Sequence, residues 1–287
     1  MDISVALPNM IPGATGKALV EWAGAAEERG FAGLGATERL VYPGYDPLIA
    51  LAAAASVTHR IRLLTNVLIA PLRSATELAK QTASVDQLSD GRLTVGLAPG
   101  VRADDFAAAG RSFDGRVAQF DNDLRALFDL WSGKAPPGAD RAVAPSPARG
   151  SRIPILIGGL TTAAAKRAAR WADGWTAPGL SAQRTALATE QVRTAWQEAG
   201  RSGAPRIVML LRFVMGDDAQ DAAAAFMRDY FAVLGAAAED FVQATPRTAA
   251  MIRQALRTYA DCGVDEVVFH PTVADVAQVH RLADVVM

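Results

Sequence analysis

Short apolar stretches alternate with stretches of helical periodicity along the whole chain. Residues 3–7 alternate larger and smaller side chains up to Pro8, and apolar residues then recur at helical spacing until Gly30. Units of one strand and one helix follow one another in the same way. The expected strands span 3–7, 33–37, 61–69, 93–97, 154–157, 174–176, 207–214 and 265–269. The expected helices span 19–26, 47–57, 77–89, 114–131, 163–171, 219–234, 247–261 and 274–285.

Strands and helices in this alternation predict the α/β class and a closed (β/α)8 barrel, the TIM barrel. Each right-handed crossover adds one parallel strand, and the sheet meets itself at the eighth. An open, doubly wound sheet with extra elements is the alternative. Residues 132–152 hold four prolines between the fourth and fifth strands. We therefore expect one barrel domain over residues 1–287, with an insertion at 132–152 beside the barrel mouth.

The amino-acid composition limits which binding partners and which cellular compartment we expect for the protein. Hydrophobic residues make up 51% of the 287 residues, and the net charge is only -1. A chain with this balance can bury a large core and has no overall field to attract nucleic acid or an acidic membrane. No stretch has the pattern of a signal peptide or a membrane span. The single cysteine, Cys262, cannot close an intrachain disulfide. We expect a cytoplasmic protein whose partner is a small molecule.

In a barrel of this kind the active site forms where the strands end, so the residues just past each strand are the candidates. They are Pro8, Asn9, Glu38, Arg39, Asn66, residues 99–102, residues 158–162, Trp175, Arg212 and His270. The histidines are far apart, and the chain has no HExxH motif and no paired cysteines. We expect no metal site. A GxSxG nucleophile elbow is absent as well.

The turn after the fifth strand has the pattern of an anion cradle. Gly158 and Gly159 let the backbone approach a phosphate, while Thr161 or Thr162 offers a hydroxyl at a helix start. Positive charge is unfavourable at a helix N-terminus, because the helix dipole is positive there. The two cations at 166–167 therefore suggest that an anion binds at this helix start and offsets their charge. A tight turn with a threonine cap is the alternative interpretation.

The fourth strand also ends in small residues. Gly96 leaves room for a flat ligand to lie against the backbone, and a β-bulge is the alternative reason for a glycine in this strand.

Two sequence blocks carry a resemblance. Residues 79–81 and 86–97 form the first block, and residues 154–159 with 167–175 form the second. In this order they closely resemble the bacterial luciferase-like family of flavin- and deazaflavin-dependent oxidoreductases. The (β/α)8 barrel of that family agrees with the strand count. Within the first block we expect structural roles for Asp86, Gly91 and Arg92, through a helix C-cap and a charge pair.

The resemblance implies how a cofactor would lie in the mouth. The flavin or deazaflavin ring would lie over a bulge at the end of the third strand, where related proteins have a non-proline cis peptide; this position maps to Asn66 and Val67. The cofactor-binding residues implied or expected here are Asn66, Val67, Gly96, Gly158, Gly159, Thr161, Thr162 and Trp175.

The chain departs from the family after the second strand. Many relatives have an acidic residue followed by a histidine implicated in proton transfer, whereas this chain has Glu38 and Arg39. Arg39 stays protonated, so it can hold a carboxylate, a phosphate or a developing oxyanion but cannot act as a base. His270 is the best titrating candidate, with a hydrogen-bonded histidine at the edge of the mouth as the alternative. Glu38 is a second candidate base, or a carboxylate paired with Arg39.

Four functions remain open at this point. We favour transfer of a hydride with the deazaflavin coenzyme F-420 on a small organic substrate. A monooxygenase that uses reduced FMN from a separate flavin reductase is the main alternative. A flavin-binding protein without turnover, and a hydrolase or lyase that holds a phosphorylated substrate in the anion cradle, are the others. The resemblance also implies a homodimer, packed through apolar, alanine-rich helix faces.

Overall fold

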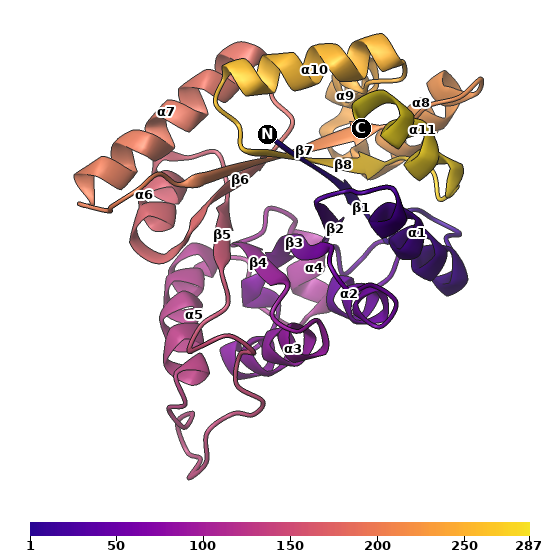
Figure 1. The fold of residues 1–287 in the computed structure, drawn as a ribbon. Helices are drawn as coiled ribbons and strands as arrows, with labels where there is room; N and C mark the ends of the chain where they lie inside the picture. The colour runs from indigo at the N-terminus through magenta and orange to yellow at the C-terminus, as the bar shows by residue number, and fades with distance from the viewer.

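The computed structural model describes residues 1–287, and its eight parallel strands close into a barrel in chain order (Figure 1). The strands are β1 (Asp2–Ala6), β2 (Gly33–Ala36), β3 (Arg62–Ile69), β4 (Leu93–Ala98), β5 (Ile155–Gly158), β6 (Gly174–Pro178), β7 (Arg206–Phe213) and β8 (Glu266–Pro271). β1 pairs with β8 and closes the sheet, with Val5 opposite Phe269. The predicted barrel is confirmed, and the open sheet is ruled out.

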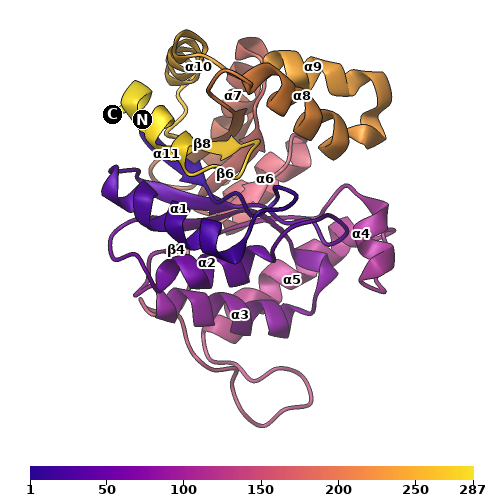
Figure 2. The same cartoon turned by 90° about the vertical axis from the view of Figure 1, so that its right-hand side faces the viewer.

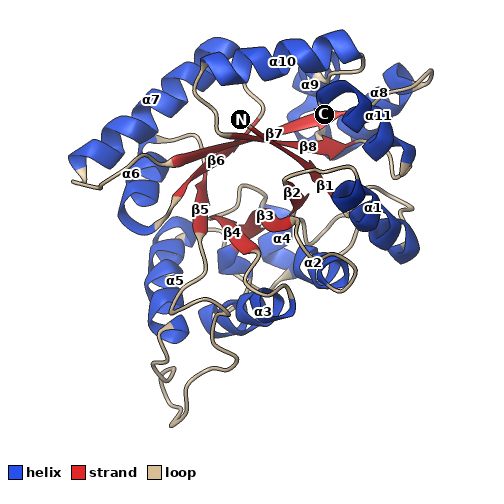
Figure 3. Cartoon of the chain, viewed as in Figure 1, coloured by secondary structure: helices blue, strands red, loops and turns tan.

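Helices surround the strands on all sides (Figure 3). They are α1 (Gly16–Glu28), α2 (Pro47–Ala55), α3 (Ala75–Leu88), α4 (Ala103–Ala108), α5 (Arg116–Trp131), α6 (Thr162–Trp171), α7 (Ala182–Glu198), α8 (Ala219–Tyr230), α9 (Ala238–Ala244), α10 (Ala249–Asp261) and α11 (Ala277–Val286), with short 3₁₀ turns η1 (Ala70–Leu72) and η2 (Ala232–Ala237). None of these helices is long and apolar enough to cross a membrane.

Three helices of the structure differ from those that the apolar periodicity predicts. α7 was not predicted, because its buried face includes Thr185 and Thr189 and so lacks a continuous apolar stripe. α4 has six residues, too few to show a helical period. The helix expected at 219–234 ends at Tyr230, and the chain continues through η2, where Gly235 has a φ of 56°, into α9.

The core forms two shells. A cluster of 55 buried residues lies between the strands and the helices. Inside the barrel a smaller apolar layer consists of Ala6, Leu64, Leu156, Val208 and Val268. Residues two positions further along a strand face the same side, so the next inward-facing side chains toward the carboxyl ends are those of the mouth. The barrel interior is therefore sealed below the mouth by packed side chains.

An ion network fills the opposite end of the barrel. Glu266, on β8, is almost completely buried. One of its carboxylate oxygens accepts a hydrogen bond from the Ser4 hydroxyl, and the other pairs with Arg206. The Arg62 Nη2 atom lies 3.6 Å from the same oxygen and 2.5 Å from the Asp2 carboxylate. This network closes the end of the barrel opposite the mouth.

The segment between α5 and β5 lies elsewhere than expected. It contains no helix or strand, and it runs along the outside of α3: the Lys80 ammonium donates to the Ala144 carbonyl, and the Ala148 amide donates to the Asp86 carboxylate, both at 2.8 Å. Figure 2 shows this loop beyond α3, away from α4, α8 and α9. The prediction that 132–152 lies beside the mouth is wrong, because α5 ends at the amino ends of the strands and the loop starts from there.

The turn between α3 and β4 is structural. The Gly91 amide donates to the Asp86 carbonyl and closes the helix end. Arg92 donates to the carbonyls of Ile61 and Thr58 rather than to a carboxylate. The expected charge pair with Asp86 does not form, and the guanidinium instead ties β4 to the end of α2.

Candidate functional site

The end of β3 forms the floor of the mouth. The pairing of β3 with β4 shifts register between Thr65 and Leu68, and the Asn66–Val67 peptide bond is cis, as expected. A Cβ atom built on Gly96 would lie 3.2 Å from Val67 Cγ1, and one built on Gly158 would lie at the same distance. The structure thus brings three predicted cofactor residues, Val67, Gly96 and Gly158, onto one surface.

The packing of the strands also explains why residue 96 is a glycine. A Cβ atom at this position would lie 2.2 Å from the Thr65 carbonyl oxygen, far inside van der Waals contact. The Thr65 hydroxyl in turn donates to the Gly96 carbonyl at 3.0 Å. The close approach of β3 and β4 therefore requires glycine here, whether or not a ligand lies above it.

The Gly158–Gly159 turn leads into α6 with an open face. Gly159 has a φ of 140°, which favours glycine, and its carbonyl accepts a 2.6 Å hydrogen bond from the indole of buried Trp175. The Thr161 hydroxyl caps the helix by accepting from the Ala164 amide. Thr161 and Thr162 are exposed. Since a helix leaves its first N–H groups without helical partners, an anion can meet them at this exposed end.

The cations near this helix do not face the cradle as a pair. Arg167 is buried and donates to both oxygens of Asp121 on α5, at 2.6 and 2.9 Å. The Lys166 side chain is exposed. The inference that both cations favour an anion at the cradle fails for Arg167, because its charge is already matched by α5.

A hydrogen-bonded set joins four strands across the mouth. The Thr37 hydroxyl donates to the Asn66 carbonyl at 3.0 Å and lies 3.3 Å from His270 Nδ1. The Thr176 hydroxyl donates to the Asn66 side-chain oxygen at 3.0 Å. Asn9 holds the Thr37 backbone through both its amide atoms. Sequence reasoning missed Thr37 and Thr176 as site residues, although each faces inward at the end of its strand.

Two polar atoms of this set are buried without a hydrogen-bond partner: Asn66 Nδ2 and His270 Nε2. The Thr37 hydroxyl has one proton, which it gives to Asn66, so toward His270 it acts as an acceptor. With the His270 proton on Nδ1, the contact with Thr37 is satisfied and Nε2 keeps a free lone pair. Such atoms are rarely left unsatisfied in a folded protein, and these two give the mouth one donor and one acceptor without a protein partner.

The pKa of His270 is lowered well below its ordinary value of 6.5. Burial is the main cause, because it disfavours the charged imidazolium, and the Arg212 guanidinium adds repulsion. Arg212 lies opposite His270 in the pairing of β7 with β8. His270 is therefore neutral at neutral pH.

This pKa predicts how stability depends on pH. Below about pH 6.5 the unfolded chain binds a proton at His270 while the native protein does not, so the free energy of unfolding falls as the pH falls, by up to about 1.4 kcal/mol per pH unit. We expect His270→Gln to remove that slope in urea denaturation between pH 6.5 and 5. The exposed His280→Gln variant is the control. An unchanged slope in His270→Gln would contradict the buried, neutral state.

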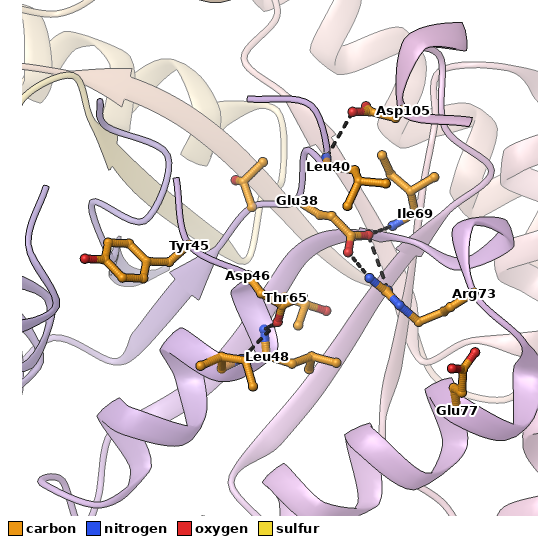
Figure 4. Close-up of polar contacts among 12 residues, drawn as sticks. Glu38, Leu40, Tyr45, Asp46, Leu48, Thr65, Ile69, Arg73, Glu77 and Asp105 are labelled. Atoms are coloured by element: carbon orange, nitrogen blue, oxygen red, sulfur yellow. Dashed lines mark hydrogen bonds and ion pairs between the residues drawn. The ribbon is translucent and has the colours of Figure 1, made fainter. Parts of the chain in front are cut away.

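Glu38 and Arg39 are held by other residues. The Glu38 carboxylate accepts a 2.5 Å hydrogen bond from the Ile69 amide and pairs with Arg73, as Figure 4 shows. Burial raises the pKa of Glu38, and Arg73 opposes that rise. Arg39 donates to the carboxylates at 104–105 of α4, at 3.0 and 2.6 Å. Glu38 is thus a paired carboxylate, but with Arg73 rather than with Arg39.

A cavity of about 460 Å³ lies beside the mouth. It is formed by the loop after β1, the loop after β8 and α8, and its walls include Ile11, Phe226 and Thr272. The Thr272 hydroxyl is buried without a partner. No group of three His, Cys, Asp or Glu side chains in the chain is placed to hold a metal ion.

Comparison with known families gives one match that spans most of the chain. The model of the luciferase-like monooxygenase family matches residues 1–270. An uncharacterised protein of Mycobacterium tuberculosis is 34% identical over 176 residues, which are 58% of this chain and 61% of that protein. An FMNH2-dependent dimethylsulfone monooxygenase of Pseudomonas putida is 25% identical over 190 residues, 63% of this chain and 51% of that protein. The matches thus span about half to three fifths of these relatives.

Solved structures share the fold over the whole chain. A monooxygenase from Streptomyces bottropensis has a TM-score of 0.83 at 23% identity, covering 100% of this chain and 98% of that one. An F-420-dependent secondary alcohol dehydrogenase, solved with an F-420–acetone adduct, has a TM-score of 0.84 at 15% identity, covering 99% and 98%. At these identities the likeness concerns the fold.

Proposed function

Because the chain belongs to the luciferase-like monooxygenase family, we propose that it is an oxidoreductase that binds coenzyme F-420 in its barrel mouth and oxidises or reduces a small organic substrate. The observation that carries the proposal is the buried His270 Nε2 atom, which has no hydrogen-bond partner in the protein. The family includes relatives named for flavin chemistry, and the mouth offers the residues that a flavin-type ring and its phosphate need.

The residues present fit such a cofactor. Val67, Gly96 and Gly158 form a surface without bulky side chains, against which a flat ring can lie. The Asn66 Nδ2 donor, in the residue before Val67, has no partner in the protein and can bind a ring acceptor. The phosphate would be held at the start of α6, by Gly159, Thr161 and Thr162, with Trp175 fixing the turn.

When bound, the deazaflavin supplies a two-electron hydride acceptor or donor. The protein's part is to hold the substrate and to move its proton. His270 Nε2 takes the hydroxyl proton when an alcohol carbon is oxidised to a carbonyl, and returns it in the reverse direction. The Thr37 hydroxyl holds the imidazole in the required tautomer. Thr37 is therefore a positioning residue, and His270 is the proposed catalytic base.

Glu38 and Arg39 have positioning roles in this proposal. Glu38 ties the Ile69 amide, at the end of β3, to Arg73. Arg39 ties the loop after β2 to α4. Since both charges are matched inside the protein, neither residue is needed to carry the substrate's proton. This favours a chemistry in which His270 acts alone as the titrating group.

A monooxygenase with reduced FMN is the second candidate, and the similarity to the Pseudomonas putida enzyme favours it. In that case a separate flavin reductase would supply the reduced cofactor, and oxygen would be a co-substrate. The same cradle would hold the FMN phosphate. The two candidates therefore differ in which cofactor binds, and not in where it binds.

Titration of the purified protein with FMN and with coenzyme F-420, oxidised and reduced, tests the proposal by fluorescence quenching. We expect F-420 to bind, and Gly159→Asp to weaken the binding by at least about 10-fold, because a carboxylate at the cradle repels the phosphate. Gly159→Asn is the matched control. It has the same shape and the same strain at a φ of 140° but no charge, so it should bind more tightly than the aspartate variant.

Binding of FMN alone would favour the monooxygenase. If neither cofactor binds, the proposed function is wrong. If a flavin binds elsewhere, both glycine variants will bind it equally, and the cradle assignment fails.

We also propose a homodimer. α2 and α3 lie side by side on the outside of the barrel, and Ile49 and Leu88 are exposed there. A second copy of the chain packed on these helices would cover them. Sedimentation velocity at micromolar concentration should show a dimer, and a monomer would contradict the assignment.

A further inference from the structure

Arg212 is a buried cation without a carboxylate partner. The residue is only 8% exposed. Its guanidinium carbon lies 5.0 Å from the ring centres of both Phe226 and Tyr230. Burial lowers the pKa of Arg212, and the groups that act in the opposite direction are Tyr230 and Tyr42, with no Asp or Glu among them. Aromatic rings attract a cation but do not neutralise its charge.

The other buried arginines of the chain show the contrast. Arg39 is paired with the carboxylates at 104–105, and Arg167 with Asp121. Buried charges in proteins are ordinarily paired in this way, because an isolated charge away from water is unfavourable. The position of Arg212 at the mouth, opposite His270, makes an external anion the partner that is missing.

We propose that Arg212 binds a carboxylate of the substrate, so that the substrates are short hydroxy acids or the corresponding oxo acids. This inference rests on the proposed function. Arg212 and His270 lie opposite each other on neighbouring strands, whose backbones are about 4.8 Å apart. A substrate with its hydroxyl at His270 can therefore place a nearby carboxylate at Arg212. The planar guanidinium suits a carboxylate, since it can donate two parallel hydrogen bonds.

A substrate carboxylate bound at Arg212 would also make His270 a stronger proton acceptor. The Arg212 charge opposes protonation of His270, and a bound anion offsets that charge. The neutral ester of the same acid would not do so. The acid should therefore both bind better and leave His270 a stronger proton acceptor than the ester.

Calorimetric titration of the F-420-loaded protein tests the inference. The probes are 2-hydroxybutanoate, 2-hydroxyhexanoate, their methyl esters and inorganic phosphate. We expect at least one acid to bind the wild type about 10- to 100-fold more tightly than its ester, the range for a hydrogen-bonded charge. Arg212→Met should lose that preference. Arg228→Met, which removes an exposed arginine of α8, should keep it.

Thermal melting without ligand gives a second measurement. Arg212→Met should melt at a higher temperature than the wild type, because the substitution removes an unpaired buried charge. A lower melting temperature would show that Arg212 stabilises the fold, and would overturn the inference.

The outcomes separate the two proposals. If F-420 binds but acids and esters bind equally, or not at all, the carboxylate assignment is wrong while the proposed function stands. If Arg212→Met keeps the preference for acids, the assignment is also wrong. If phosphate competes at Arg212 and the acids do not, the residue binds a phosphate instead, and the substrate class is overturned. If no cofactor binds, the proposed function has failed.

Discussion

Replacing Glu266 with alanine is expected to lower the free energy of unfolding by about 3 kcal/mol. Removing one partner of a buried ion pair typically costs about 3–5 kcal/mol, and the lower end applies because the Arg206 side chain is 30% exposed. The substitution leaves Arg206 and the Ser4 hydroxyl without their acceptor inside the barrel. Urea denaturation at neutral pH measures the change.

The exposed pair between Arg29 and Asp284 provides the control for this prediction. Asp284→Ala also removes a carboxylate from an arginine, but at the surface, where such pairs contribute less than about 1 kcal/mol. A similar small loss for both variants would show that the network at the closed end of the barrel contributes little to stability.

Gly96→Ala is expected to destabilise the protein by about 3 kcal/mol. The new Cβ atom would lie 2.2 Å from the Thr65 carbonyl oxygen, so that β3 and β4 must move apart in the middle of a closed sheet. Overpacking a well-packed interior costs about 1–3 kcal/mol, and backbone cannot rotate away as a side chain can. The same denaturation experiment applies.

Gly24→Ala is the matched substitution in a helix. A Cβ atom there has no neighbour within 4 Å, and alanine favours the helix over glycine by up to about 1 kcal/mol, so this variant should be more stable than the wild type. Comparing Gly96→Ala with Gly24→Ala also tests whether Gly96 is needed for the packing of β3 against β4 or for ligand binding. Unchanged stability with loss of cofactor binding would show that the glycine serves the ligand and not the packing of β3 against β4.

The barrel was predictable from the sequence because its strands carry local signals. β7 contains a continuous apolar run over residues 207–211, and helices α2 and α3 begin at capping residues, Asp46 and Ser74. α7 lacked such a signal, since threonines take part of its buried face. The course of 132–152 was not predictable either, because it depends on contacts with α3 that no local pattern encodes.

The candidate site was predictable as a set of positions but not as a set of partners. Asn66, Val67, Gly158 and Trp175 were expected from the strand ends and the family resemblance. The structure places the first three at the mouth, while Trp175 lies in the core outside the strands and only supports the Gly159 turn. Whether a buried arginine has a carboxylate partner depends on residues that are far away in the sequence. Arg39 meets the carboxylates of α4, 65 residues further along the chain, whereas Arg212 lies against Phe226 and Tyr230 and has no carboxylate partner. Sequence spacing could not show that difference.

The loop outside α3 offers a point of attachment. Gly138 and Ala139 are exposed in this segment, which leaves the barrel on a side that the mouth does not use. A cysteine at Ala139 would add a surface thiol to a chain whose one native thiol, Cys262, is half-buried. The protein could then be immobilised on an electrode or a bead with its mouth toward the solution, where diffusing substrates and soluble electron donors reach it.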